Sequence, residues 1–255
     1  MDVIVCVKQI PDPAAPGELD PESNTLKRDG KLILDEADSY GVEMALQLVD
    51  AAGGGEVSLI SMAADGEVAG MRTALAMGAA KGVVVSDPAL AGADALSTAK
   101  VLAAAARRVG DADLIIGATE SSDGYTGTVP EQMAAVMGLP SVTFAKSVAF
   151  EGGILKVNRQ TDAGYDEVEC PAPAVISVTA GVVEPRYPSF KGIMAAKSKP
   201  VETVSAADLG VEVASYAQSI VDVAEAPARE AGEVIVDEGE AHLNIVAFLE
   251  GLKVI

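Results

Sequence analysis

The sequence has few basic residues, few aromatic side chains, one histidine and two cysteines, and each shortage excludes a class of protein. Its 255 residues include 18 Lys and Arg against 38 Asp and Glu, a formal net charge of −20. Such a surface repels a phosphate backbone, so nucleic acid is not expected as a partner. Aromatic residues make up 4% of the chain and tryptophan is absent. The core is therefore expected to consist mainly of aliphatic side chains.

The scarcity of histidine and cysteine removes the usual zinc sites, because neither H-x-x-x-H nor C-x-x-C occurs. The single His242 lies in an acidic C-terminal stretch and is interpreted as a solvated helix residue. Cys6 and Cys170 are expected to be buried free thiols, which fits a reducing cytoplasm. No apolar run reaches the 18 residues that a bilayer requires, and the N-terminus lacks the pattern of a signal peptide. We expect a cytoplasmic protein without a transmembrane segment.

Short apolar runs alternate with amphipathic segments over the first 140 residues. Strands are predicted at Val3–Val7, Glu56–Met62, Gly82–Ser86 and Asp113–Gly117, and helices at Asp38–Asp50, Glu67–Met77, Ala93–Val109 and Glu131–Met137. Four strand-then-helix units imply parallel pairing with right-handed crossovers. The predicted fold class is α/β, with an open, doubly wound, mostly parallel sheet.

The pattern changes after Pro140. A hairpin is predicted over Lys146–Val157 around Gly152-Gly153, a strand at Pro173–Thr179 and a helix over Glu240–Leu252. Residues 201–255 hold eleven acids against two bases, which is a poor composition for an independent core. We therefore expect one α/β domain over residues 1–200 and a C-terminal extension over 201–255 that lies on the domain or on a partner.

Ligands of open parallel sheets bind beyond the carboxyl ends of the strands. The loop after the fourth predicted strand, Gly117–Pro130, is rich in small and hydroxyl residues and opens a helix. Backbone N–H groups at a helix N-terminus would suit a phosphate, but the same residues would also serve as helix caps without a ligand, and both interpretations stay open. The fingerprint G-x-G-x-x-G and the P-loop pattern are absent. No constellation for catalysis by side chains is present.

A second unusual stretch runs from Pro185 to Pro200. It carries four basic residues and no acid, interleaved with Tyr187, Phe190, Ile193 and Met194. In so acidic a chain this reversal indicates a docking surface with apolar anchors. The alternative is a loop and helix that pack their own apolar residues, with solvated basic side chains.

Five long segments resemble the β subunits of electron transfer flavoproteins. They are VCVKQIPDP near the start, RTALAMGA at 72–79, DLIIGATESSDG at 113–124, VNRQTDAGYDEVECPAPAVISV at 157–178, and EPRYPSFKGIMAAK at 184–197. The resemblance covers nearly the whole chain. It implies a fold like that of the adenine nucleotide α-hydrolases and a heterodimer with an α subunit.

The resemblance further implies an electron carrier without substrate chemistry of its own. AMP would be bound in the β domain and FAD would be shared with the α subunit. Electrons would arrive from acyl-CoA and other dehydrogenases, as in fatty acid β-oxidation, and leave through a membrane quinone oxidoreductase.

By position, the family's nucleotide contacts correspond to Cys6, Asp35, Glu36, Ala37, Asp38, Met62, Ser121, Ser122, Asp123, Gly124, Tyr125, Thr126, Gly127, Thr128, Val129, Pro130, Glu131 and Gln132. The partner-recognition loop of the family corresponds to residues 180–199, with Arg186, Tyr187, Phe190, Lys191, Ile193 and Met194 as docking residues. Phe190 stands where the apolar anchor of the family projects.

The chain departs from many members of the family in the loop after the fourth strand. It keeps Asp123-Gly124 but lacks the Gln-Thr-Gly that often follows, and Asp35–Asp38 is unusually acidic for a segment beside a phosphate. These departures leave open a bifurcating relative that holds a second FAD in place of AMP. The sheet pattern and the phosphate-type loop, taken alone, also fit a nucleotide-binding regulatory domain of the universal-stress type.

Overall fold

The computed structural model describes residues 1–63, 66–212, 216–224, 226–228, 231–232 and 234–255. The chain divides into two units, residues 1–221 and 222–255. The first unit contains the sheets and five of the α-helices among the described residues, and the second contains one helix. The structure confirms the predicted α/β class.

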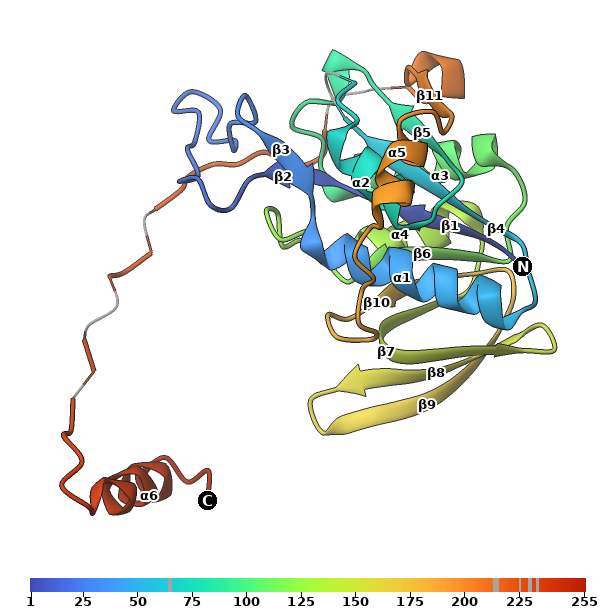
Figure 1. Ribbon diagram of the computed structural model, residues 1–255. Coiled ribbons are helices and arrows are strands. Elements are labelled where there is room, and N and C mark those ends of the chain that lie inside the picture. Colours follow the sequence, from blue (N-terminus) through green and yellow to red (C-terminus); the bar gives the residue numbers. More distant parts are fainter. Residues whose placement is uncertain (64–65, 213–215, 225, 229–230, 233) are drawn as a thin grey trace. The chain divides into compact units, whose positions relative to one another are not determined.

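The first unit is built around one large sheet flanked by helices (Figure 1). The strands are β1 (Asp2–Cys6), β2 (Gln9–Pro11), β3 (Leu32–Leu34), β4 (Glu56–Met62), β5 (Lys81–Val85), β6 (Leu114–Ala118), β7 (Ser141–Glu151), β8 (Ile154–Thr161), β9 (Gly164–Pro171), β10 (Ala174–Val178) and β11 (Val201–Val204). The helices are α1 (Glu36–Ala51), α2 (Ala69–Met77), α3 (Ala95–Val109), α4 (Val129–Met137) and α5 (Phe190–Ala196), with short 3₁₀ turns η1 (Pro88–Leu90) and η2 (Ala207–Leu209).

The large sheet has nine strands in the order β11-β5-β4-β1-β6-β10-β7-β8-β9. The strands from β11 to β7 pair in parallel, and β7, β8 and β9 form an antiparallel end. Strands β2 and β3 form a separate antiparallel pair. The parallel strands are apolar on both faces because helices cover both faces.

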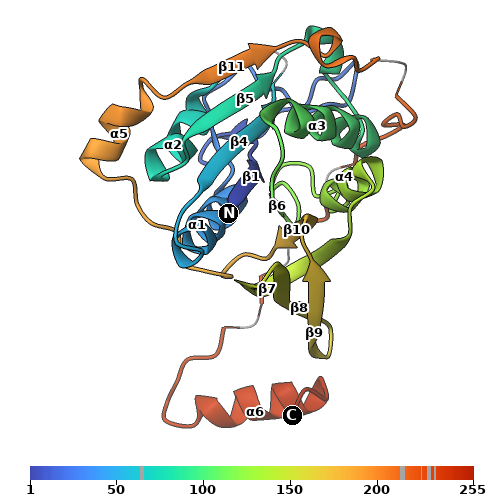
Figure 2. The ribbon, with the colours of Figure 1, turned by 90° about the vertical axis from the view of Figure 1, so that its right-hand side faces the viewer.

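Two apolar clusters fill the space between sheet and helices. Side chains of α1 and α2 pack on one face, and those of α3 and α4 pack on the other (Figure 2). Neighbouring residues of one strand serve opposite faces: Val3 and Val5 belong to the first cluster and Ile4 to the second. The core is largely aliphatic, as the composition predicted.

Four strands escaped prediction, namely the short pair β2 and β3 and the two edge strands of the large sheet. Strand β9 is an edge strand whose residues are mostly exposed, so its sequence shows no alternation of apolar and polar residues. Strand β11 has four residues and pairs only with β5, at the other edge. The domain boundary expected at residue 200 thus precedes a strand of the sheet, and the division between the two units lies at Val221/Asp222.

The second unit contains helix α6 (Ala241–Gly251), close to the helix predicted over Glu240–Leu252. None of its residues is buried, and Leu243, Ile245 and Phe248 are more than half exposed. His242 is exposed, as predicted. Within the described residues, no helix is long and apolar enough to cross a membrane.

Candidate functional site

The predicted nucleotide residues gather at the carboxyl ends of β1, β4 and β6. The strand order reverses between β1 and β6: β4 and β5 lie on one side of β1, whereas β6 and β10 lie on the other. Such a switch point opens a crevice beyond the strand ends, because the connections leave in opposite directions. The segments that follow β1 and β6, together with the start of α1, meet at this point.

Asp35 fastens the loop after β6 to the start of α1. Its carboxylate accepts hydrogen bonds from the backbone N–H of Ser122 at 2.8 Å and from the Ser122 hydroxyl at 2.7 Å. It also accepts from the Ala37 N–H at 3.1 Å and caps α1. Asp35 is fully buried, so its carboxylate oxygens accept hydrogen bonds from donors of the chain itself and not from water. This placement explains how an acid can stand beside a predicted phosphate site.

Asp38 likewise accepts a hydrogen bond from the backbone, just beyond the end of β1. Its Oδ2 accepts from the backbone N–H of Lys8 at 2.6 Å. Burial raises the pKa of Asp38 well above its usual value, and the nearby carboxylates of Asp35 and Asp123 raise it further against the opposing hydrogen bond from Lys8. Glu36, by contrast, is exposed.

Asp123 joins three segments through two cations. Lys8 Nζ donates to its Oδ1 at 2.6 Å and to Ser121 Oγ at 3.2 Å, and Arg28 Nη2 contacts its Oδ2. Burial alone would raise the pKa of Asp123, but the charges and hydrogen bonds of Lys8 and Arg28 outweigh burial and lower it. The Asp123 side chain is 6% exposed, whereas the two cations are about 40% exposed. Two partly exposed cationic side chains, Lys8 and Arg28, therefore lie at the switch point.

The sequence did not point to Lys8 or Arg28 as site residues. Lys8 follows β1 by two residues, so its position beyond a strand end was an available signal. Arg28 lies in the long loop between β2 and β3, and no local pattern marks it. Only the tertiary structure places Arg28 beside Asp123, which is 95 residues away in the sequence.

The start of α4 offers unused polar groups. The N-cap residue Thr128 accepts no capping hydrogen bond from a backbone N–H of the first turn, and its hydroxyl accepts instead from Gln132 Nε2 at 3.2 Å. Among the described residues, buried side-chain oxygens of Glu131 and Gln132 have no hydrogen-bond partner. Tyr125 has a φ of 50°, in the left-handed region, and its side chain is 67% exposed. Unpaired buried oxygens and a strained, exposed aromatic residue are features of a binding site.

Cys6 and Met62 lie at the ends of β1 and β4. The Cys6 thiol contacts Met133 Sδ at 3.7 Å, and burial, with a smaller contribution from Asp38, raises its pKa to about 12. Cys6 is thus a packing residue and a poor nucleophile. Both cysteines are free thiols, as predicted.

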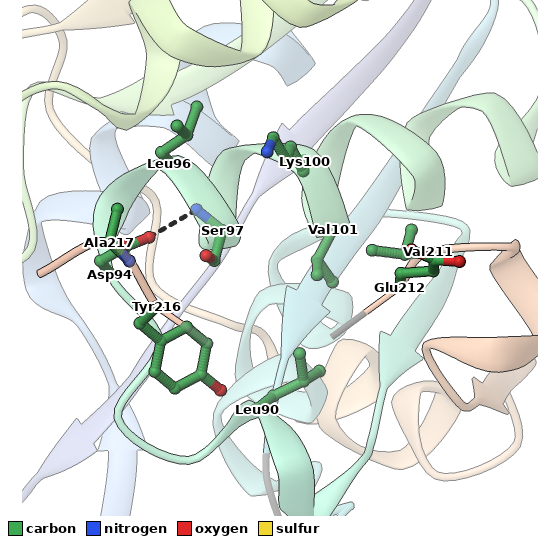
Figure 3. Close-up of a pocket in the computed structure, with 10 residues that line it drawn as sticks. All are labelled: Leu90, Asp94, Leu96, Ser97, Lys100, Val101, Val211, Glu212, Tyr216 and Ala217. Carbon is green, nitrogen blue, oxygen red and sulfur yellow. Dashed lines mark hydrogen bonds between the residues drawn. The ribbon is translucent and has the colours of Figure 1, made fainter. Parts of the chain in front are cut away.

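Two cavities lie away from the switch point. One of about 100 Å³ is lined by residues of η1 and α3 together with Tyr216 and Ala217 (Figure 3). The Tyr216 hydroxyl donates to the Ala89 carbonyl. Asp94 borders this cavity and accepts from the backbone N–H groups of Ser97 and Ala217. A second, of about 450 Å³, is lined by residues of the 11–31 loop. Neither contains a predicted nucleotide residue, and the first is too small for a nucleotide. Among the described residues no cluster suits a metal ion.

The predicted docking residues lie on or just before α5. Tyr187 and Phe190 are 93% and 81% exposed, and Ile193 and Met194 are about half exposed. Lys191 is also exposed. Arg186 differs, because its guanidinium contacts Glu43 of α1. The structure thus gathers an apolar surface around Phe190.

Comparisons with known proteins show the family of the chain. The model of the electron transfer flavoprotein domain matches residues 23–209. The electron transfer flavoprotein subunit beta of Mycobacterium tuberculosis is 38% identical, with 100% of this chain and 99% of that protein covered. The same-named subunit of Megasphaera elsdenii is 33% identical, covering 86% and 83%. Subunit CarD of the caffeyl-CoA reductase-Etf complex of Acetobacterium woodii is also 33% identical, covering 83% and 81%. The chain belongs to the electron transfer flavoprotein β-subunit family.

Proposed function

We propose that the chain is the β subunit of a cytoplasmic, heterodimeric electron transfer flavoprotein that binds AMP at the switch point and shares an FAD with its α subunit. It takes electrons from dehydrogenases, acyl-CoA dehydrogenases among them, and passes them toward a membrane quinone oxidoreductase. The bound flavin supplies the redox chemistry, and this chain binds, orients and docks. Because the family match spans most of the chain, we do not retain the universal-stress-type alternative.

The observation that carries the nucleotide proposal is the start of α4 beside the β1/β6 switch point. The first turn of α4 offers backbone N–H groups, except at Pro130, and the exposed Tyr125 ring offers an aromatic face to one ligand. Buried side-chain oxygens of Glu131 and Gln132 in the same turn have no hydrogen-bond partner among the described residues. Lys8 and Arg28 add positive charge within the same cluster. These groups fit an adenine nucleotide, which carries both a phosphate and a flat base.

A second FAD in place of AMP is the alternative that the altered loop at Tyr125–Pro130 favours. Acid extraction of the purified heterodimer followed by flavin and nucleotide quantification distinguishes the two. One flavin and one AMP per heterodimer support the proposal, whereas two flavins and no AMP support the alternative. Absence of both a flavin and an α-like subunit after purification from the native source would contradict the proposal altogether.

The docking role rests on the surface around Phe190. An exposed aromatic residue on a short helix, flanked by Ile193 and Met194, is suited to an apolar pocket of a partner. We expect Phe190→Ala to raise the heterodimer concentration needed for half-maximal electron transfer from a dehydrogenase. Unchanged transfer from every dehydrogenase that donates to the wild type would contradict this role.

Helix α6 supports a contact with the α subunit. Its apolar residues are distributed around the helix, with His242, Asn244 and Glu250 between them, and none of its residues is buried. A helix with this composition requires a partner surface, because its apolar side chains otherwise face water. We propose that residues 222–255 form an arm that packs on the α subunit.

A further inference from the structure

Helix α5, which carries the proposed docking surface, is mounted on α2 by close backbone contact. A Cβ atom at Gly192 would collide with the carbonyl oxygen of Ala76 in α2, so only glycine permits this approach. Ala196, at the end of α5, is 3% exposed and belongs to the core. One side of this short helix thus rests on α2, while Phe190 projects into solvent.

The two helices cap each other at their C-terminal ends. Arg72 of α2 donates through Nη1 to the carbonyl oxygens of Ala196 and Lys199, at 2.7 and 2.6 Å. Lys199, just beyond α5, donates through Nζ to the carbonyl oxygens of Leu75 and Ala79, at 2.8 and 2.6 Å. Ala196 and Leu75 belong to the last turns of the two helices, and Lys199 and Ala79 follow those turns. The C-terminal end of a helix carries partial negative charge, so each cation is bound favourably at the C-terminal end of the other helix. Burial lowers the pKa of Lys199, consistent with a desolvated ammonium group.

A third contact holds the chain before α5. Arg186 donates from Nε to Glu43 Oε2 at 2.6 Å and from Nη2 to Oε1 at 3.0 Å, a bidentate geometry. Glu43 is 3% exposed in α1. Burial would raise the pKa of Glu43, but the hydrogen bonds from Arg186 outweigh burial and lower it. The segment is therefore fixed to α1 before α5 and to α2 after it.

These contacts show that the basic residues of Pro185–Pro200 differ in their roles. Of its four cations, Arg186 and Lys199 bind groups of the chain itself, and Lys191 and Lys197 are exposed. A helix of seven residues is not stable alone, because too few hydrogen bonds compensate for its nucleation. The tertiary contacts must therefore supply its order.

We infer that Arg72, Lys199 and the Arg186–Glu43 pair are positioning residues for partner docking: they hold α5 in its binding conformation before a dehydrogenase arrives. This inference rests on the proposed docking function. Because α5 is already ordered in the free protein, binding does not incur the entropy cost of ordering this segment. If the competent fraction falls to about a tenth, the apparent affinity falls about tenfold.

The test uses the co-purified heterodimer with Arg72→Gln and Lys199→Gln. Both substitutions should raise the heterodimer concentration for half-maximal transfer about tenfold, with the saturated rate changed less than about twofold. Arg72→Lys keeps a cation near the two carbonyls and should restore part of the affinity. Arg108→Gln is the matched control: it removes an exposed pair with Glu202 on α3 and β11 and should change neither quantity.

Hydrogen–deuterium exchange of residues 186–199 in the same heterodimers separates the possible failures. Faster exchange together with weaker docking in the Arg72→Gln and Lys199→Gln proteins supports the inference. Unchanged exchange in both variants overturns the inference. Faster exchange with unchanged docking also overturns it, provided that Phe190→Ala weakens docking in the same assay. If Phe190→Ala has no effect on transfer, the proposed docking surface itself is wrong and the positioning role fails with it.

Discussion

Asp123→Asn tests the contacts that order the loop at the switch point. In the wild type, Asp123 accepts charged hydrogen bonds from Lys8 and Arg28. Such a bond contributes about 1.5–3 kcal/mol when buried, but an exposed ion pair contributes about 0–1 kcal/mol. The carboxylate is buried and both cations are about 40% exposed, so we discount for solvent and expect a loss of about 2 kcal/mol in the free energy of unfolding at pH 7.

Urea denaturation of the full chain, followed by far-UV circular dichroism, measures this loss. Circular dichroism suits a chain without tryptophan. Glu202→Gln, which removes an exposed ion pair with Arg108, is the control and should leave the urea midpoint unchanged.

The pH dependence supplies a second criterion. The folded-state pKa of Asp123 lies below its ordinary value of 3.8, so the stabilisation is present above that value and is lost as pH falls through the folded pKa. The difference between wild type and Asp123→Asn should not decrease from pH 8 to pH 5. The Asp123 charge raises the pKa of Asp38, so the substitution relieves that repulsion where Asp38 is ionised, and this can reduce the difference only at the upper end of the range. Equal midpoint shifts for Asp123→Asn and Glu202→Gln, or a difference that disappears by pH 5, would refute the reasoning.

Three other predictions concern the helix packing, the thiol and the arm. Gly70→Ala should destabilise the fold by about 2 kcal/mol in urea, because the added Cβ would lie 2.7 Å from Gln9 Cγ and 2.9 Å from the Leu34 backbone nitrogen; an unchanged midpoint would disprove that contact. Native Cys6 should react with a thiol reagent at pH 8 at least about a hundredfold more slowly than free cysteine, because burial raises its pKa to about 12; rapid labelling of Cys6, located by mass spectrometry, would contradict its burial. Ending the chain at Val221 should leave the melting temperature of the first unit nearly unchanged but reduce co-purification with the α subunit; equal loss of both would show that residues 222–255 support the first unit.

The strands and helices of the parallel part followed from local patterns. The run at Glu56–Met62 matched β4 because a strand buried on both faces carries apolar or small side chains at nearly every position, here with Ser58 and Ser61 among the buried ones. The helices that cover the sheet were found from their apolar spacing, and the loop after β6 was singled out because ligands of such sheets bind beyond strand ends. Edge strands such as β9 lacked this signal, because exposure on one side removes the pressure for apolar residues.

The sequence by itself thus determined the fold class, because burial dictates composition locally, and the family, because long ordered segments carry the resemblance. Only the tertiary structure decided which partner each charged side chain binds. Asp35 binds Ser122, which is 87 residues away, and Arg186 binds Glu43 across 143 residues. A carboxylate or a guanidinium has no preferred direction of its own, since its partner is whichever opposite group the folded chain brings within hydrogen-bond distance. Residues that looked like ligands or docking contacts in the sequence can therefore serve, once folded, to hold the site and the docking helix in place.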